Sequence, residues 1–231
     1  MHSGSATSAC IMLDDKMSET VFLFDVDNTL LDNDRVTADL KHFMLGELGD
    51  ERTAHYWRLF EELRTELGYA DYLGALQRYR VECPYDSHVL TVSNFLINYR
   101  FANRLFPRSL DVIDHVRKWG KPVILTDGDA VFQPRKVERS GLLEATDGNI
   151  LIYIHKEKEL ADLERRYPAD HYVLFDDKLR ILDAIKAQWK DRVTTVFVKQ
   201  GHYANDVDRS LYAAADIELN DISEAIDLEF N

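Results

Sequence analysis

The sequence predicts an α/β fold: a doubly wound, Rossmann-like parallel sheet core with an inserted all-helical cap domain. Two observations predict this arrangement. From Ser109 onward, short apolar runs alternate with segments of helical periodicity, which is typical of parallel strands joined by helices. Between the first apolar run and Ser109, residues 36–100 carry helical spacing throughout.

The first strand is predicted at about residues 21–26, within the stretch "VFLFDVDNTLLD". In the helical block that follows, apolar residues recur three and four positions apart, as on the buried face of an amphipathic helix. Four such faces occur: Val36, Leu40, Phe43 and Leu48; Tyr56, Leu59, Phe60, Leu63 and Leu67; Tyr72, Leu73, Leu76 and Tyr79; Val89, Val92, Leu96 and Tyr99.

The alternating part of the chain supplies the other strands of the sheet. Strands are predicted at 122–126, 150–154, 172–175, 193–198 and 215–219, and helices at 110–119, about 130–140, 156–166, 178–189 and the C-terminus. The predicted domains are therefore an α/β core formed by residues 20–32 and 106–231 and a helical cap at 33–105. The small polar residues of the tail, 1–19, are expected to be disordered.

Composition limits the partners of the protein. The net charge of −13 argues against a nucleic acid or an anionic membrane, so any site for an anionic substrate needs local positive charge. No apolar run approaches the roughly 20 residues of a spanning helix, and the N-terminus lacks the features of a secretory signal. Cys10 and Cys83 are too few for a disulfide framework. We expect a cytoplasmic protein that acts on a small molecule.

Three of the apolar runs end in acidic residues. "VFLF" leads into Asp25, "VILT" into Asp127, and "YVLF" into Asp176 and Asp177. Each acid alone is compatible with a helix cap or a turn. However, the carboxyl ends of parallel strands line one crevice, so together these acids should converge.

Convergence of these acids requires positive charge beside them. Two like charges about 4 Å apart repel by roughly 4 kcal/mol at an effective dielectric constant of about 20. Carboxylate ligands of this kind suit Mg²⁺. A basic residue should also lie nearby, and Lys156, just after a strand, is the best candidate, with Lys158 second. Lys136, beside Arg135 and Arg139, is expected on a solvated helix face.

At this point the residues resemble a known family. "FDVDNT" (24–29), "LTDG" (125–128), Lys156 and "FDD" (175–177) are similar to the four ordered motifs of the haloacid dehalogenase-like (HAD) hydrolase superfamily. The resemblance covers the chain from about residue 20. It implies a Mg²⁺-dependent phosphatase that acts on a small phosphorylated metabolite, a phosphate monoester, through an aspartyl-phosphate.

The resemblance also implies a role for each acid. Asp25 would be the nucleophile, and Asp27 the general acid that protonates the leaving alcohol and then the base that activates water. Mg²⁺ would lie between the Asp25 carboxylate, the Asp27 backbone carbonyl, and Asp176 and Asp177, with Asp177 the more direct ligand.

The transferred phosphoryl group has its own predicted partners. Thr126 and Lys156 would hold its oxygens, helped by the backbone N–H groups of Asp127 and Gly128 at a helix start. The family more often has Asn in the position of Asp127, so the role of this acid is open. Gly128 could equally be an ordinary turn glycine.

The inserted helices resemble the C1-type cap of the superfamily, a lid that excludes water and selects the substrate. The candidates for specificity are polar residues of this segment: Arg35 first, then His42, Arg58, Arg64, Tyr69 and Arg100. Each could instead lie on a solvated face.

Three alternatives to the phosphatase remain. A phosphomutase would use the same aspartyl-phosphate. A 2-haloacid dehalogenase is less favoured, because that branch usually lacks an acid at the position of Asp27. A non-catalytic module that binds metal and phosphate would be a different class of protein, but such members usually lose the nucleophile or the acid. The physiological substrate and the oligomeric state are not indicated by the sequence.

Overall fold

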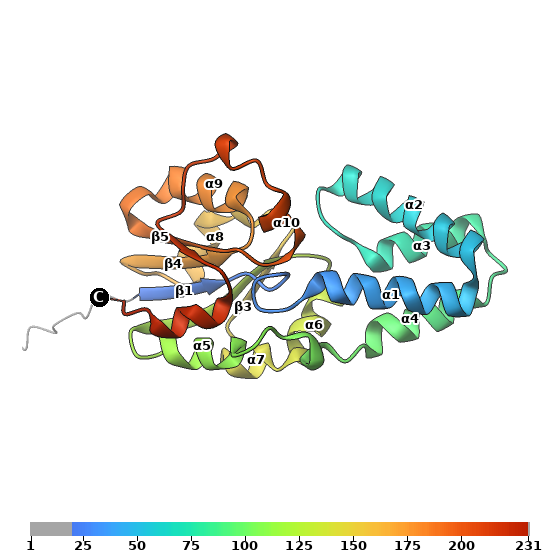
Figure 1. The fold of residues 1–231 in the computed structure, drawn as a ribbon, viewed down its shortest axis with the longest axis horizontal. Helices are drawn as coiled ribbons and strands as arrows, with labels where there is room; N and C mark the ends of the chain where they lie inside the picture. Colours follow the sequence, from blue (N-terminus) through green and yellow to red (C-terminus); the bar gives the residue numbers. More distant parts are fainter. Residues whose placement is uncertain (1–19, 231) are drawn as a thin grey trace, which may run out of the picture.

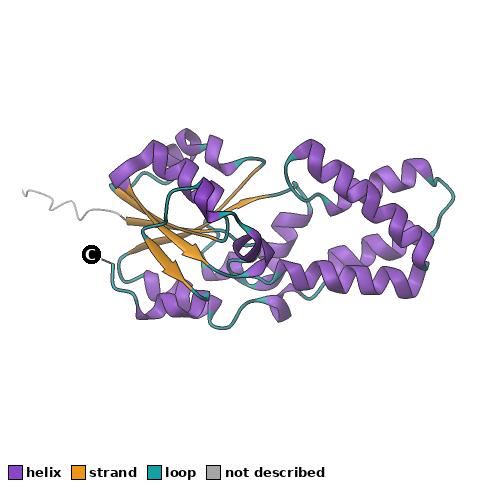
Figure 2. Ribbon diagram, turned by 45° about the horizontal axis from the view of Figure 1, so that its top comes forward, coloured by secondary structure: helices purple, strands orange, loops and turns teal. Residues whose placement is uncertain are grey.

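The computed structural model describes residues 20–230, which form a six-stranded sheet, flanking helices and a helical extension (Figures 1 and 2). The strands are β1 (Thr20–Phe24), β2 (Gly120–Asp127), β3 (Ile150–Tyr153), β4 (His171–Asp176), β5 (Val193–Val198) and β6 (Ile217–Leu219). The predicted tail, residues 1–19, lies outside the described residues, as does Cys10.

The helices fall into two groups along the chain. Those of the insertion are α1 (Asn33–Leu48), α2 (Asp50–Leu67), α3 (Tyr72–Glu82) and α4 (His88–Asn98). Those of the core are α5 (Ser109–Val116), α6 (Phe132–Ser140), α7 (Leu142–Ala145), α8 (Leu160–Arg166), α9 (Leu179–Trp189) and α10 (Gly201–Asp206). Five 3₁₀ helices complete the description: η1 (Phe101–Arg104), η2 (Lys156–Lys158), η3 (Lys190–Arg192), η4 (Arg209–Leu211) and η5 (Ile222–Asp227).

The sheet has the order β3-β2-β1-β4-β5-β6, and every adjacent pair of strands is parallel. Helices cover both of its faces (Figure 2). The predicted doubly wound α/β fold is confirmed. Strands β2 and β3 lie on one side of β1, and β4 to β6 lie on the other, so the order in which the chain adds strands reverses at β1. The central switch point of the sheet therefore falls at the carboxyl end of β1.

Alternate residues of β1 face opposite sides of the sheet and divide the hydrophobic core in two. Val21 and Leu23 belong to a cluster that includes side chains of α8 and α9. Phe22 and Phe24 belong to a second cluster, which includes side chains of α5 and extends into the insertion. Because both faces of β1 are buried, its sequence is an uninterrupted apolar run.

The helices of the insertion begin and end at residues suited to those positions. Asp32 Oδ1 accepts a hydrogen bond from Arg35 N at 2.8 Å before α1, and Asp71 Oδ1 accepts one from Gly74 N at 2.6 Å before α3. Gly68, with a φ of +80°, ends α2 in the left-handed conformation. The four helices lie beyond the carboxyl end of β1 (Figure 1).

Two chain segments join the insertion to the core, and they run antiparallel to each other. Leu31 and Leu105 form an antiparallel bridge. Asp32 N donates to Arg104 O at 2.8 Å, and Phe106 N donates to Leu30 O at 2.9 Å. The entering and leaving chains are therefore tied together at the edge of the core.

The elements differ from the prediction in several places, of which three bear on the site or the ends of the chain. Residues 156–158 form the 3₁₀ helix η2, so that α8 begins only at Leu160, and the C-terminal helix is the 3₁₀ helix η5. The short helix α10 was not predicted, because six residues are too few to show periodicity.

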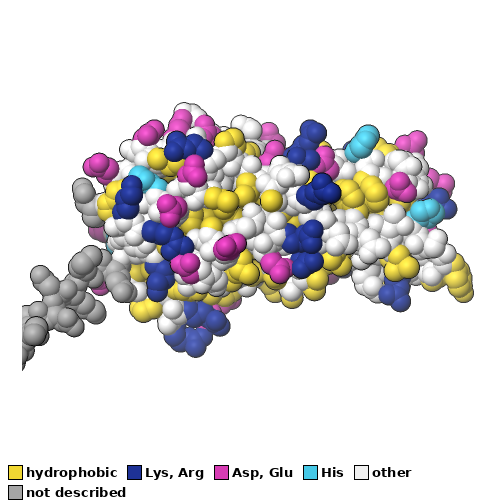
Figure 3. Space-filling model, turned by 90° about the horizontal axis from the view of Figure 1, so that it is seen from below, with side chains coloured by type: hydrophobic (Ala, Val, Ile, Leu, Met, Phe, Trp, Pro, Cys, Tyr) yellow, Lys and Arg dark blue, Asp and Glu magenta, His cyan; other side chains and the backbone are white. Residues whose placement is uncertain are grey.

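Two surface properties bear on partners. No helix within residues 20–230 combines the length and the apolar character needed to cross a membrane. On the face of the molecule shown in Figure 3, acidic and basic side chains are interspersed rather than separated.

Candidate functional site

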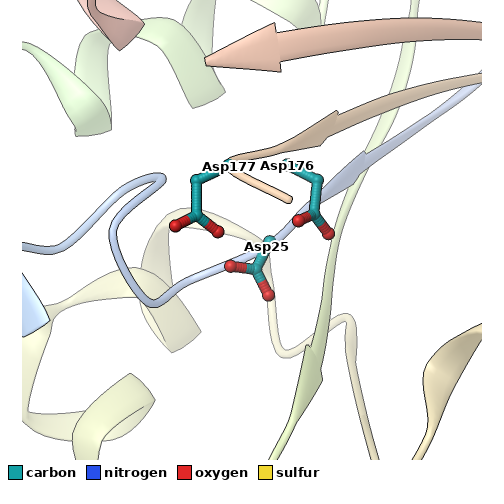
Figure 4. Close-up of side chains that lie close together, drawn as sticks. All are labelled: Asp25, Asp176 and Asp177. Carbon is teal, nitrogen blue, oxygen red and sulfur yellow. The ribbon is translucent and has the colours of Figure 1, made fainter. Parts of the chain in front are cut away.

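Three carboxylates meet where β1 and β4 end (Figure 4). Asp25 follows β1 directly, and its backbone N–H donates to Phe175 O at 3.0 Å, which extends the pairing of the two strands. One carboxylate oxygen each of Asp25, Asp176 and Asp177 lies within 4.8 Å of the others. Their exposed fractions are 2%, 0% and 0%. The sequence-based prediction that distant acids converge is met by these three.

Part of this cluster lacks hydrogen-bond donors. Both carboxylate oxygens of Asp177 are buried without a hydrogen-bond partner. Burial and the neighbouring carboxylates raise the pKa of Asp177 well above its ordinary value, and burial raises the pKa of Asp176. Buried polar atoms without partners are rare in folded proteins and require an explanation.

A divalent cation bound among the three carboxylates would explain their oxygens without partners. Carboxylate oxygens are the ligands that Mg²⁺ prefers, and a cation bound among them would remove the cost of burying like charges. Among the described residues, Asp25, Asp176 and Asp177 are the one group of three or more potential ligands close enough to hold a metal ion. The donor set therefore fits Mg²⁺.

Lys156 supplies a fixed positive charge on one side of the cluster. It follows β3 in η2, and its side chain is 1% exposed. Its Nζ lies 2.5 Å from Asp25 Oδ1 and 2.7 Å from Asp176 Oδ2, and donates to Leu125 O at 3.3 Å. Although burial acts to lower it, the carboxylates of Asp176 and Asp25 raise the pKa of Lys156 above its ordinary value. Lys156 is therefore charged and bound to the proposed nucleophile.

Lys136 lies in the site as well, contrary to the prediction of a solvated helix face. Its side chain is 1% exposed, and its Nζ lies 2.5 Å from Asp27 Oδ1 and 3.0 Å from Asn33 Oδ1. Gln133 Nε2, one turn earlier on α6, lies 2.9 Å from Thr126 Oγ1 and 3.5 Å from Asp27 Oδ2. The Asp27 side chain is thus held by α6, outside the three-carboxylate cluster. If Asp27 is a metal ligand, as predicted, it would bind the ion through its backbone carbonyl.

The turn between Asp25 and α1 is fixed by Asn28, which the sequence analysis did not single out. Asn28 has a φ of +63° and is 1% exposed. Its Oδ1 accepts hydrogen bonds from Asn33 N at 3.0 Å and Asp34 N at 3.2 Å. On its other side it packs against Gly201, where an added Cβ would lie 2.4 Å from Asn28 Cβ. The turn that carries both proposed catalytic acids is therefore held from two directions.

Thr29 also contacts Asp25. Its Oγ1 lies 3.4 Å from Asp25 Oδ2. The hydroxyl is completely buried, which explains why a small polar residue follows the two acids.

The predicted phosphate-binding residues are brought together only in part. Thr126 is 1% exposed and accepts the hydrogen bond from Gln133. The Gly128 N–H, however, donates to Tyr153 O at 2.9 Å and so is not available to a phosphate. An added Cβ at Gly128 would lie 2.6 Å from Gln133 Cβ, so this glycine allows α6 to pack closely.

The expected helix start at Gly128 is also displaced. Helix α6 begins four residues later, at Phe132. The backbone N–H groups of Val131 and Phe132 donate to Asp129 Oδ1 at 2.8 and 2.7 Å. This N-terminus is already satisfied by a carboxylate and is closed to an anion.

Asp127 has a structural partner of its own. Its Oδ1 accepts a hydrogen bond from Lys156 N at 2.7 Å, which positions the start of η2. Burial raises the pKa of Asp127 to about 6, although the charge and backbone N–H of Lys156 act in the opposite direction. The acid at this position therefore helps to place Lys156.

A cavity of about 690 Å³ opens between the insertion and the core and reaches Asp27, Asp127 and Lys178. Of the polar cap residues considered for specificity, Arg64 and Tyr69 line it. Arg35 is instead ion-paired with Asp39 at 3.3 Å, and Arg58 with Glu62 at 2.8 Å.

Comparison with solved structures gives close agreement with one protein and a shared fold with others. The chain is 54% identical to a protein from Burkholderia xenovorans LB400 described as a haloacid dehalogenase-like hydrolase; the match covers 92% of this chain and 100% of that one, with a TM-score of 0.89. No family model and no curated protein matches the sequence.

Two more distant structures show the fold alone. The L-2-haloacid dehalogenase from Xanthobacter autotrophicus is 16% identical over 90% of this chain and 97% of that one, with a TM-score of 0.60. The HAD-hydrolase YfnB from Bacillus subtilis, bound to magnesium, is 15% identical over 90% of this chain and 96% of that one, with a TM-score of 0.58.

Proposed function

The chain belongs to the haloacid dehalogenase-like hydrolases, and we propose that within this family it is a Mg²⁺-dependent phosphatase that hydrolyses a small phosphate monoester. The observation that carries the proposal is the position of Asp27. This acid is two residues from the nucleophile candidate Asp25, its side chain is 24% exposed, and it lines the cavity.

Asp27 favours phosphoryl transfer over carbon–halogen cleavage. An alcohol that leaves phosphorus needs a proton, and a positioned acid that supplies it typically contributes about 10²–10⁴-fold to the rate. A halide leaves without a proton. The distant L-2-haloacid dehalogenases share the fold, and at 16% identity this likeness does not extend to the reaction.

Asp25, Asp176 and Asp177, with the backbone carbonyl of Asp27, would hold the Mg²⁺. When bound, the ion would neutralise charge on the phosphoryl oxygens.

The side chains divide the remaining chemistry. Asp25 attacks phosphorus, the bond from phosphorus to the ester oxygen breaks, and Asp27 gives its proton to the departing alcohol. Asp27 then takes a proton from water as that water attacks the aspartyl-phosphate, which releases phosphate and restores Asp25. Lys156, bound to Asp25, provides a cation beside the charge that develops on the phosphoryl group.

Phosphate release from 4-nitrophenyl phosphate tests the proposal. We expect turnover with Mg²⁺, none with EDTA, and a loss of at least about a thousandfold in Asp25→Asn. Asp170→Asn, which changes an exposed acid, is the matched control and should retain full activity. Full turnover by Asp25→Asn would refute the proposal, and transfer of phosphate to a sugar phosphate instead of water would identify a phosphomutase.

A further inference from the structure

The cavity is much larger than the phosphoryl group that the site would bind. Its volume of about 690 Å³ lies within the range of pockets that enclose whole organic ligands, about 300–1,000 Å³. Asp27, Asp127 and Lys178 mark the end where the reaction would occur. The rest of the volume therefore surrounds the leaving alcohol, and its lining describes that alcohol.

Aromatic side chains form part of this lining, and they come from both the insertion and the core. The rings of Phe60 and Tyr72 are stacked with centroids 4.8 Å apart, and Trp57 meets Phe60 edge-on at 5.1 Å. Tyr203 of α10, in the core, also lines the cavity. The aromatic residues that line the cavity are Trp57, Phe60, Tyr69, Tyr72, Tyr203 and Tyr212. Such walls favour a flat ring over a compact polar group.

The two arginines that line the cavity are already paired with acids. Arg64 is paired with Glu61 at 2.7 Å, and Arg180 with Glu157 at 2.9 Å. Lys178 lies at the reacting end, with its Nζ 4.8 Å from the centroid of the Tyr203 ring. The arginines would have to give up their partners to bind a second anionic group of the substrate.

Acids in the same lining work against a second anion directly. Asp34, Asp206 and Glu61 also line the cavity. Asp34 Oδ1 lies 2.6 Å from His202 Nδ1. A carboxylate or second phosphate on the substrate would share the cavity with these acids and would compete with Glu61 for Arg64, which disfavours a second anion.

We propose that the substrate is an ester with a single phosphate whose alcohol carries an uncharged, planar aromatic or heteroaromatic ring. This inference rests on the proposed phosphatase function and names its substrate class. It separates the protein from phosphatases of phosphorylated carboxylic acids and of bisphosphates.

Three substrates test the preference at nearly constant leaving-group chemistry. Benzyl phosphate and cyclohexylmethyl phosphate both release a primary alcohol and differ in the planarity of the ring, and 2-phosphoglycolate carries a carboxylate instead. We expect kcat/KM for benzyl phosphate to exceed that for cyclohexylmethyl phosphate by about three- to tenfold and that for 2-phosphoglycolate by more. Equal values for the two ring esters, or a preference for 2-phosphoglycolate, would overturn the inference and leave the phosphatase in place. Inactivity toward all three and toward 4-nitrophenyl phosphate with Mg²⁺ would overturn the phosphatase itself.

A variant connects the preference to the aromatic lining. Tyr203→Leu keeps an apolar side chain but removes a ring that is 39% exposed, so the fold should tolerate it. We expect the ratio of kcat/KM for benzyl over cyclohexylmethyl phosphate to fall toward one. Tyr85→Leu removes a tyrosine that is 98% exposed and lies outside the cavity lining, and should leave the ratio unchanged. An unchanged ratio in Tyr203→Leu would contradict the assignment of Tyr203 to the ring site.

Discussion

Among single residues, Lys136 shows how the proposed general acid is held. Its buried ammonium group joins Asp27, on the turn after β1, to Asn33, the first residue of α1. Removing one member of a buried ion pair leaves the other charge uncompensated. Since the proposed mechanism requires Asp27 to reach the leaving oxygen, a change at Lys136 should act on proton transfer through the position of Asp27.

We therefore predict that Lys136→Met slows substrates according to how much they need an acid. The first turnover of benzyl phosphate should fall by about ten- to a hundredfold, whereas that of 2,4-dinitrophenyl phosphate, whose leaving group needs no proton, should change by a few fold at most. Rapid-quench measurement of alcohol release isolates this step. Lys41→Met, at an exposed lysine of α1, is the control. Equal losses for both esters would assign Lys136 a purely structural role.

Asp127 allows a prediction about pH. Its pKa, raised by burial to about 6, means that the folded protein binds a proton more tightly at this site than the unfolded chain does. Stability from this group is therefore present below about pH 4 and is lost as the pH rises to about 6, by at most about 3 kcal/mol.

Asp127→Asn keeps an oxygen to accept the hydrogen bond from Lys156 N and removes the titration. We predict that the variant matches the wild type in stability near pH 4 and exceeds it at pH 8. Urea unfolding in EDTA across this range measures the difference, in which the titrations of groups that do not interact with Asp127 cancel. A variant that is less stable than the wild type at pH 8 would contradict the pKa assignment.

The acids and Lys136 differ in how far sequence could place them. Asp25, Asp176 and Asp177 each follow an apolar strand, and parallel strands bring their carboxyl ends together, so local sequence was enough. Lys136 is flanked by Arg135 and Arg139, which conceals its burial. Lys136 lies three or four residues from Gln133, Phe132 and Ser140, which are all buried, so the four residues share one face of α6. This helical spacing was the signal in the sequence that Lys136 faces the core.

Among the elements, the turn between β1 and α1 depends on α10, a helix from the other end of the chain. His202 N donates to Asp34 Oδ2 at 2.8 Å, and Gly201 packs on Asn28. No local sequence pattern predicts this contact, because it joins residues about 170 positions apart and involves a helix of only six residues. Sequence could predict that a turn exists after Asp27 but not what holds it.

The contact at Gly201 can be tested against a matched glycine. Gly201 and Gly148 both have positive φ values, +70° and +76°, but an added Cβ meets Asn28 at 2.4 Å at the first and nothing within 4 Å at the second. We predict that Gly201→Ala destabilises the protein by about 1–3 kcal/mol more than Gly148→Ala, and also lowers phosphatase activity. Denaturant unfolding measures the first effect. Equal destabilisation of the two variants would show that the turn at Asn28 can move away from an added Cβ at position 201 without a loss of stability.

At the scale of the whole molecule, the insertion and the core share one hydrophobic cluster. It runs from Phe22 and Phe24 of β1 through Phe132 of α6 to Tyr72 of α3. The ring of Phe132 lies 5.3 Å from that of Tyr72 and 5.5 Å from that of Phe101. Periodicity predicted the helices of the insertion but not that their hydrophobic cluster continues into the core, because the apolar face of a helix does not specify which element it packs against. The cavity and its aromatic lining, which depend on how the two parts meet, could not be predicted either.

The acid cluster links the stability of the whole molecule to metal. Because the pKa of Asp177 is raised in the fold, the metal-free protein should lose stability as the pH rises above the ordinary value of an aspartate, about 3.9. A cation that binds only the folded state adds about 2.7 kcal/mol at a hundred times its Kd. For a chain of this length that raises Tm by about 5–10 °C.

We predict that saturating Mg²⁺ raises Tm at pH 8 and does so much less at pH 5, where protons occupy the same carboxylates. Asp177→Asn should be more stable than the wild type in EDTA at pH 8, because one buried charge is gone, and should lose most of the Mg²⁺-dependent shift. Differential scanning fluorimetry with and without Mg²⁺ measures both, and Asp170→Asn should behave as the wild type does. An equal Mg²⁺ shift in Asp177→Asn would place the ion elsewhere, and the proposed chemistry at Asp25 would then lose the cation that it requires.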